Sequence, residues 1–227
     1  MPNSLSFARV RIWDLPTRLF HALLVVSVIG LVVTGEVGGD AMKIHFWLGY
    51  TVLTLVFFRV VWGWVGGHWS RFSHFVPTPA KLCAYLQALR AQQTTPPIGH
   101  NPLGALSVLA MLSLLMLQVF SGFMSDDEIS NAGPWTSLIP NNWVEWATTY
   151  HSDIGKAALL VLIGLHVSTV LYYKHVKKED LITPMLQGDK NVPEGTPASR
   201  DSFTSRLFAA AVLLGCAYGV YRLVQLG

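Results

Sequence analysis

Four of the eight histidines lie in long apolar stretches, where an imidazole needs a specific partner. His21 lies about two turns into the first stretch and His45 opens the second. His151 opens the fourth helix, and His166 lies 15 residues later on the same helix. On an ideal α-helix the last two are separated by about 22 Å of rise and about 60° of rotation, so they share one face at two depths. The first two stretches offer one imidazole at each of these depths. Depth therefore predicts two pairs, His21 with His166 and His45 with His151.

Two imidazoles from facing helices are the axial ligands that a six-coordinate haem iron needs, and a helical bundle provides a slot for the flat macrocycle. Two such pairs predict two non-covalent haem b groups. A metal ion without porphyrin is a weaker interpretation, because two imidazoles leave zinc or copper short of ligands. Hydrogen-bonded core histidines are the structural alternative. The sequence has no CxxCH motif for covalent haem, and its two cysteines, Cys83 and Cys216, stand far apart.

Five apolar stretches are long enough to carry these histidines through a hydrocarbon core, which takes about 20 mainly apolar residues per helix. Only 13% of the 227 residues are charged and the mean hydropathy is +0.42, which excludes an ordinary soluble enzyme, a disulfide scaffold or a disordered chain. We predict an all-α integral membrane four-helix bundle holding two haems, plus a fifth C-terminal transmembrane helix. The stretches are Leu15–Thr34, Ile44–Val65, Leu103–Met124, Ile154–Tyr173 and Leu207–Gln225.

The basic residues predict the orientation of these helices. Eleven of the 16 Lys and Arg residues lie at the start of the first stretch or in the second-to-third and fourth-to-fifth connections. The other two connections, 36–43 and 125–150, contain only Lys43. The positive-inside rule then predicts a multi-pass protein of the bacterial inner membrane, with a cytoplasmic N-terminus and with the 125–150 connection and the C-terminus outside. The first helix has no small-residue cleavage site near its end, so we expect it to be retained.

The domain organisation follows from these stretches. We predict a four-helix haem domain over 1–180, a cytoplasmic linker over 181–204 and the fifth helix over 205–227. Within the linker, residues 188–200 have the polar composition of a flexible tether. Residues 78–92 begin with Thr-Pro and carry apolar side chains at helical spacing, which predicts an amphipathic helix on the cytoplasmic membrane surface.

Cations near the predicted haems are candidates for binding the anionic propionates. Arg18 lies one turn before the first of the four histidines, Arg59 at the cytoplasmic end of the second stretch, and Lys156 five residues after His151. The alternative for each is snorkelling to lipid headgroups. Three glycines permit close approach of a macrocycle or, equally, ordinary helix packing. They are Gly49, Gly155 and Gly164.

The remaining histidines are weaker candidates. His100, together with Asn101, can bond a haem propionate or a quinone carbonyl, or can cap the third helix. His68, His74 and His175 lie in connections, where we expect solvated interface residues.

Several motifs together resemble the bacterial di-haem cytochrome b561 family, which includes the b-type membrane subunits of nickel–iron hydrogenases. They are RIWDLPTRLFH, IHFWLGY, FRVVWGWVG, SRFSHF, GHNPLGAL and YHSDIGKAALLVLIGLHV, in order over about residues 9–180. The resemblance implies that His21, His45, His151 and His166 are the axial haem ligands. It also implies a role in passing electrons between the membrane quinone pool and a redox partner. The fifth helix lies outside the shared core.

We therefore predict a membrane di-haem b-type cytochrome that transfers electrons between quinone or quinol and a partner such as a periplasmic c-type cytochrome. Quinol oxidation or quinone reduction is the activity such a protein can have. One alternative is the b-type subunit of a Ni/Fe-hydrogenase or another respiratory complex. The other is a non-redox membrane transport or assembly protein, although transporters usually show broken helices or inverted repeats. We expect contact with membrane lipid and none with nucleic acid.

The connection 125–150 is acidic and leads to His151. It contains Asp126, Asp127, Glu128 and Glu145 and no Lys or Arg. Such a rim favours association with a basic redox protein through electrostatic steering. The alternative is that the carboxylates only keep the loop soluble.

Overall fold

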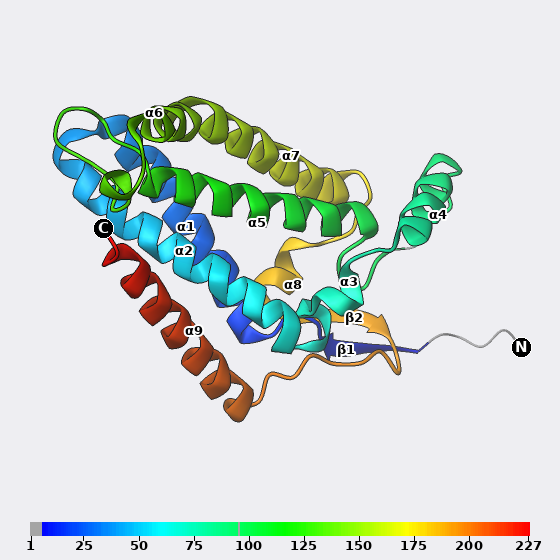
Figure 1. Cartoon of the computed structure of the whole chain (residues 1–227). Coiled ribbons are helices and arrows are strands. Elements are labelled where there is room, and N and C mark those ends of the chain that lie inside the picture. The colour runs from blue at the N-terminus through cyan, green and yellow to red at the C-terminus, as the bar shows by residue number, and fades with distance from the viewer. Residues whose placement is uncertain (1–5, 95) are drawn as a thin grey trace, which may run out of the picture. The chain divides into compact units, whose positions relative to one another are not determined.

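The computed structural model describes residues 6–94 and 96–227, and these are mainly helical (Figure 1). Within them, five helical segments are long and apolar enough to cross a membrane, which confirms the predicted all-α membrane fold. The segments are α1 (Leu15–Val37), η1 with α2 (Gly39–Ala41 and Met42–Val65), α5 (Pro102–Phe123), α6 with η4 and α7 (Asn141–Thr149, Tyr150–Gly155 and Lys156–His175), and α9 (Phe203–Val224).

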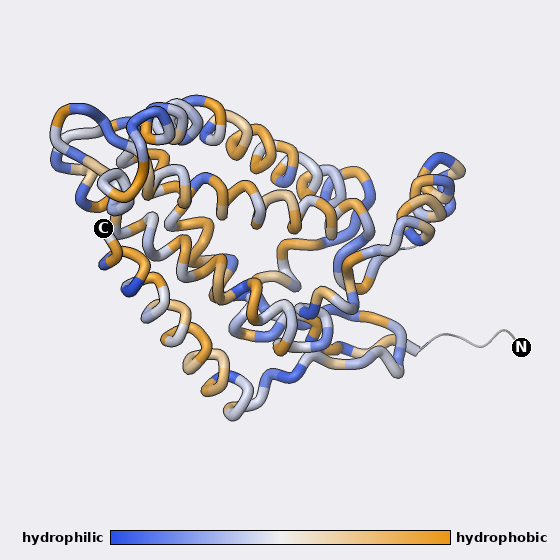
Figure 2. Tube along the Cα trace, in the orientation of Figure 1, coloured by the Kyte–Doolittle hydropathy of each residue, from blue (hydrophilic) through white to orange (hydrophobic). Residues whose placement is uncertain are grey.

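The outward faces of these helices are apolar. Large side chains such as Val26, Trp47 and Leu214 are 68–73% exposed, and Figure 2 shows hydrophobic residues along the long helices, with hydrophilic ones gathered in the connections. Apolar surface of this extent is unfavourable in water and is satisfied by lipid, and helices complete their backbone hydrogen bonds internally, as a membrane requires. The chain is therefore a multi-pass membrane protein.

The chain divides into two compact units. The first unit comprises the residues up to Leu19, Val60–Leu109 and His166–Ala209, and the second comprises Phe20–Arg59, Ala110–Leu165 and Ala210–Gly227. The charges divide in the same way. All eleven basic residues used to predict the cytoplasmic side belong to the first unit, and the acidic residues of the 36–43 and 125–150 connections belong to the second.

In the first unit, β1 (Phe7–Arg11) pairs antiparallel with β2 (Asp189–Pro193), with Arg9 opposite Asn191. The flexible tether predicted for residues 188–200 is therefore wrong at β2. Two causes order this segment. Arg11 forms an ion pair with Asp189 at 2.6 Å, and Val192 is buried against Ile12 and Trp13. A polar composition did not reveal a strand whose partner lies about 180 residues earlier.

Buried Asp14 joins three segments of the first unit. Its carboxylate caps the start of α1 by accepting a hydrogen bond from the Thr17 amide at 2.8 Å. It also accepts from the Ser70 hydroxyl at 2.9 Å, the Gly67 amide at 3.1 Å and the Trp62 indole at 3.2 Å. A Cβ on Gly67 would lie 2.2 Å from this carboxylate, so the close approach requires glycine. These donors fix the end of α2 and the following turn to the start of α1.

The first unit also contains short helices in its connections. They are η2 (His68–Ser70), α3 (Phe72–Phe75), α4 (Pro79–Arg90) and α8 (Ile182–Gln187). The α4 helix confirms the predicted helix over 78–92, and the Thr78 hydroxyl caps it by accepting from the Lys81 amide at 3.3 Å. Its position at a membrane surface stays a prediction.

In the second unit, α2, α5 and α7 contribute buried apolar residues, among them Leu53, Leu115 and Leu159. The connection after α5 includes η3 (Thr136–Leu138) and is fixed to α9 by Trp135, whose indole donates to the Leu223 carbonyl at 2.9 Å. The 125–150 connection and the C-terminal end of α9 therefore lie at the same end of the second unit, as the two spanning helices between them require.

Candidate functional site: a cavity with two facing histidines

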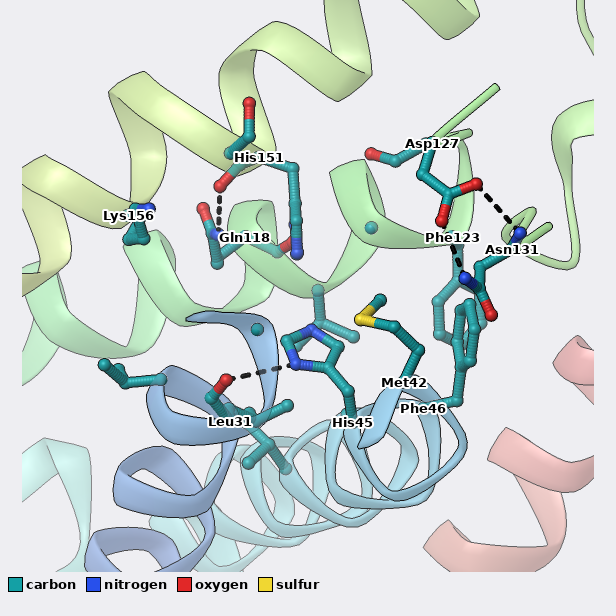
Figure 3. Close-up of a pocket in the computed structure, with 18 of the residues that line it drawn as sticks. Leu31, Met42, His45, Phe46, Gln118, Phe123, Asp127, Asn131, His151 and Lys156 are labelled. Carbon is teal, nitrogen blue, oxygen red and sulfur yellow. Dashed lines mark hydrogen bonds between the residues drawn. The ribbon is translucent and has the colours of Figure 1, made fainter. Parts of the chain in front are cut away.

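The second unit contains a cavity of about 410 Å³, a size typical of small-molecule and cofactor sites. Residues from α1, α2, α5, η4 and α7 line it, together with part of the 125–131 loop. Most of the lining is apolar, and the polar groups include His45, His151, Gln118, Lys156 and Glu36. Figure 3 shows the two imidazoles entering the cavity from different helices, His45 from α2 and His151 from η4.

The two imidazoles have the separation that a shared metal centre needs. Their ring centroids lie 6.1 Å apart, with an interplanar angle of 80°. A metal–imidazole bond is about 2.0–2.1 Å long, so two ligands on opposite sides of one metal ion have their nitrogens about 4 Å apart and their ring centres about 6 Å apart. The structure thus brings His45 and His151 together as the sequence predicts, at a distance that fits an iron between them.

Hydrogen bonds fix which nitrogen of each ring faces the cavity. The Nδ1 of His45 donates to the Leu31 carbonyl at 3.1 Å, and the Nδ1 of His151 donates to the Gln118 carbonyl at 2.8 Å. A carbonyl oxygen only accepts, so each Nδ1 carries the proton and each Nε2 keeps its lone pair. Metal-binding histidines almost always make this kind of second contact. Both residues are therefore prepared to ligate through Nε2.

Glycines bring neighbouring helices close to these rings. A Cβ on Gly35 would lie 3.3 Å from His45 Cε1, and a Cβ on Gly122 would lie 2.7 Å from His151 Cε1. Of the three glycines singled out from the sequence, Gly49 lines the cavity. A Cβ on Gly155 would overlap the Gln118 side chain, and the Cβ position of Gly164 is open. The close approaches at Gly35 and Gly122 were not predicted.

His151 lies in a π-helical turn. The η4 segment, Tyr150–Gly155, interrupts a continuous helix that runs from Asn141 to His175. The predicted helix started at Ile154, so the helix begins thirteen residues earlier than expected. Single π-turns inside α-helices are rare and often occur at functional sites. The turn also changes the direction of His151 relative to the α-helical spacing assumed from the sequence.

Lys156 lines the cavity, and it forms an ion pair with Glu36 at 2.9 Å. Both side chains are partly exposed, Lys156 at 41% and Glu36 at 64%. The Lys156 ammonium is thus near enough to the paired imidazoles to contact a group bound between them, and Glu36 is its acidic partner.

The other predicted ligands and cations lie elsewhere. Half-buried His21 belongs to the second unit and half-buried His166 to the first, and their pairing stays a prediction. Arg59 is only 3% exposed and belongs to the second unit, but it does not line this cavity. Arg18 belongs to the first unit, where its guanidinium donates to the Leu186 carbonyl at 2.6 Å.

His100 packs between two aromatic rings in the first unit, at 4.8 Å from Trp13 and 4.7 Å from Phe75. Capping of α5 is done by its neighbour Asn101, whose side-chain oxygen accepts from the Gly104 amide at 2.7 Å. The capping role considered for His100 therefore falls to Asn101. Contact of His100 with a propionate or quinone stays a prediction.

The remaining connection histidines belong to the first unit too. His68 and His74 have ring centroids 3.9 Å apart, and His175 is exposed in the last turn of α7. Burial and the nearby His74 and Arg71 lower the pKa of the His68 imidazole. None of the three lines the cavity.

Gln118 is the functional candidate that sequence reasoning missed. It is the only Asn or Gln in α5, and it contacts His151 through both its main chain and its side chain. A polar side chain within a membrane span is a candidate by default. The signal that could have identified Gln118 is thus an uncharged amide within an apolar span.

The acidic loop beside the cavity is internally ordered. The Asp127 carboxylate accepts from the side-chain amide of Asn131 at 2.6 Å and from its main-chain amide (Figure 3). It also accepts from the main-chain amides of Ile129 and Ser130. These hydrogen bonds, the Asn131 side chain first, hold the pKa of Asp127 well below its usual range. Asp127 is therefore a structural residue of the loop as well as part of its negative charge.

A membrane helical bundle with two imidazoles facing each other across an apolar cavity defines a class, that of membrane cytochromes with non-covalent haem. The family model for prokaryotic cytochrome b561 matches residues 12–188. The chain belongs to this family and is a membrane b-type cytochrome, with haem and electron transport as the family's properties.

Similar proteins have low sequence identity and long coverage. A probable Ni/Fe-hydrogenase B-type cytochrome subunit of Azotobacter chroococcum is 26% identical over 220 residues, covering 83% of this chain and 91% of the relative. The protein with the same description in Bradyrhizobium diazoefficiens is 23% identical over 214 residues, covering 80% and 85%. A probable Ni/Fe-hydrogenase 1 B-type cytochrome subunit of Escherichia coli K12 is 25% identical over 138 residues, covering 49% and 58%. No solved structure matches this chain.

Proposed function

We propose that this protein is a di-haem cytochrome that transfers electrons between the membrane quinone pool and a redox protein. The observation that carries this proposal is the His45–His151 pair, 6.1 Å between ring centroids, with both Nδ1 protons held by main-chain carbonyls. A haem bound here supplies a one-electron couple. The family assignment favours this redox class over a transport or assembly function.

The chain's own residues hold and orient this haem. His45 and His151 ligate through Nε2, and the apolar walls of the cavity exclude water and so favour binding of the macrocycle. Lys156 neutralises a propionate of this haem, and the ion pair with Glu36 keeps the Lys156 ammonium group beside the cavity. The second haem has His21 and His166 as ligands, with Arg18 and Arg59 as the cations for its propionates.

The distribution of charge supports the orientation. The basic connections face the cytoplasm, and the acidic 36–43 and 125–150 connections face the outside of the bacterial inner membrane. A partner such as a periplasmic c-type cytochrome exchanges electrons at the second unit, beside the His45–His151 haem. His100 serves a propionate or quinone in the first unit. Net quinol oxidation or quinone reduction is the resulting activity.

The relatives support a second candidate. Proteins similar over four fifths of this chain are described as Ni/Fe-hydrogenase B-type cytochrome subunits. As such a subunit, the protein would receive electrons from a hydrogenase-like redox subunit at the same acidic surface. Purification of the native complex from mild detergent distinguishes the two. A stable stoichiometric redox partner supports the subunit, and a protein purified alone that oxidises quinol supports the independent cytochrome.

Haem content tests the proposal directly. We expect two non-covalent b-type haems per purified chain, both low-spin. His45→Ala and His151→Ala should each lose the same haem, and His21→Ala and His166→Ala should each lose the other. The matched control is His175→Ala, because this imidazole is exposed at the end of α7. Full haem content in His45→Ala or His151→Ala would contradict the ligand assignment, and a colourless wild-type protein would contradict the function.

A further inference from the structure

Gln118 makes two hydrogen bonds of opposite direction to one residue. Its main-chain carbonyl accepts from Nδ1 of His151 at 2.8 Å, and its side-chain Nε2 donates to the main-chain carbonyl of His151 at 2.7 Å (Figure 3). The second bond fixes the amide orientation, because a carbonyl oxygen cannot donate and the NH₂ group must therefore face it. One residue of α5 thus holds both the ring and the backbone of His151.

The backbone bond acts where the helix is least regular. His151 lies in the π-helical η4 turn, and such a turn is wider and less favourable than α-helix. A donor from a neighbouring helix to a carbonyl of this turn stabilises it relative to the α-helical alternative. Without that donor, relaxation of the turn would move the Cα of His151 and with it the Nε2 position.

Gly155 makes the space that the Gln118 side chain occupies. This glycine is buried, and a Cβ on it would lie 2.1 Å from Gln118 Oε1 and 2.6 Å from the Tyr150 ring. Among the residues described, Gln118 Oε1 is buried and has no hydrogen-bond partner. The amide is therefore held in place by its Nε2 contact with His151 and by the shape of the space beside Gly155.

The geometry points to Gln118 as the positioning residue of His151, one that sets the ring plane and the Nε2 position of this haem ligand. The inference rests on the proposed function and adds a residue that acts through His151. Outer contacts of this kind are worth about 10–100-fold in metal affinity. They also affect the angle between the two imidazole planes, 80° in this structure, to which a low-spin ferric haem is spectroscopically sensitive.

The test compares purified, haem-loaded wild-type protein with Gln118→Leu, which removes the amide and keeps a side chain of similar size. We expect about 10-fold or greater loss of affinity for one haem, together with a shifted low-spin EPR signal of that haem and an unchanged signal from the other. The matched control is Ser113→Ala, because Ser113 is an exposed polar residue of the same helix and does not line the cavity.

A second variant reaches the same contact from the other side. Gly155→Ala keeps Gln118 but displaces its amide, so it should shift the same EPR signal. Both changes disrupt the same contact, that between the Gln118 amide and His151. The double variant should therefore lose no more haem affinity than Gln118→Leu alone, whereas independent losses would add. An unshifted EPR signal with undiminished haem affinity in Gln118→Leu, or in Gly155→Ala if the first does not fold, would overturn the inference. A wild-type protein without haem would overturn the proposed function instead.

Discussion

Replacing Gly122 with Ala should expel the haem held by His151, and the structure gives the size of the effect. The added Cβ would lie 2.7 Å from Cε1 and 3.0 Å from Nδ1 of the imidazole. Carbon atoms in contact prefer about 3.5–4.0 Å, so the ring must recede by about 1 Å. Metal ligands tolerate displacements of about 0.2 Å, and the Nδ1 contact to Gln118 would be lost as well. We expect haem affinity to fall by at least about 10–100-fold.

Two further glycines calibrate this prediction. Gly35→Ala places its Cβ 3.3 Å from His45 Cε1 and should weaken the same haem less, and Gly164→Ala meets no atom within 4 Å and should have no effect. Helical Gly→Ala changes otherwise stabilise by about 0.5–1 kcal/mol, so reduced helix propensity cannot explain a loss. The assay is haem per chain and the reduced-minus-oxidised spectrum of protein purified in detergent. Full haem content and an unchanged spectrum in Gly122→Ala would refute the placement of His151 as a ligand.

Three other changes have clear expected outcomes. Asp14→Ala leaves the buried donors of Trp62, Gly67 and Ser70 without their acceptor. Because each unpaired donor costs about 1–3 kcal/mol, the melting temperature in detergent should fall sharply in Asp14→Ala and less in Asp14→Asn. An unchanged melting temperature in Asp14→Ala would argue against this network. Glu36→Gln removes a negative charge beside the cavity and should raise the midpoint potential of the haem bound there. Lys156→Gln removes a positive charge and should lower this potential. Shifts of the same sign in the two variants would show that the cavity does not hold the haem. The double variant Glu128→Gln/Glu145→Gln removes exposed charges and should slow electron exchange with a basic redox protein at low salt only. The control is Asn131→Ala, which keeps every carboxylate but removes a donor to Asp127. Unchanged kinetics in the double variant would leave these carboxylates a solubility role alone.

The fold was predictable where hydropathy alone determines it. Five apolar stretches gave five spanning helices, and α4 with its Thr78 cap follows from residue types at local spacing. The sheet was not predictable in this way. The β1–β2 pair joins residues about 180 positions apart, and its ordering comes from Arg11 ion pairs and burial of Val192, which a polar composition conceals. Long-range pairing and ion pairs leave no periodic signal in a single sequence.

The meeting of His45 and His151 was predictable from the sequence, but the contacts that orient their rings were not. Depth arithmetic paired His45 with His151 because ligand type and position along a span are local properties. The Leu31 and Gln118 carbonyls carry no sequence signal of their own, since every residue has a carbonyl and only packing decides which one meets an imidazole. The π-turn at His151 is equally hidden, because the hydrogen bond that its backbone accepts comes from the side chain of another helix.

Hydrophobic packing and hydrogen bonds have different roles in this cavity, which has apolar walls and two imidazoles with fixed orientations. In a membrane span, hydrophobic contacts fix the depth of a residue but leave its ring free to rotate, because lipid and apolar side chains offer no directional force. Hydrogen bonds supply the direction, and main-chain carbonyls of α1 and α5 are the acceptors that add no charge to the cavity. From α5, the Gln118 side chain also donates to the main-chain carbonyl of His151 itself. The position of His151 therefore depends on α5 as well as on the helix that carries it. Under the proposed ligation, a sequence change in α5 would alter the haem without touching either histidine.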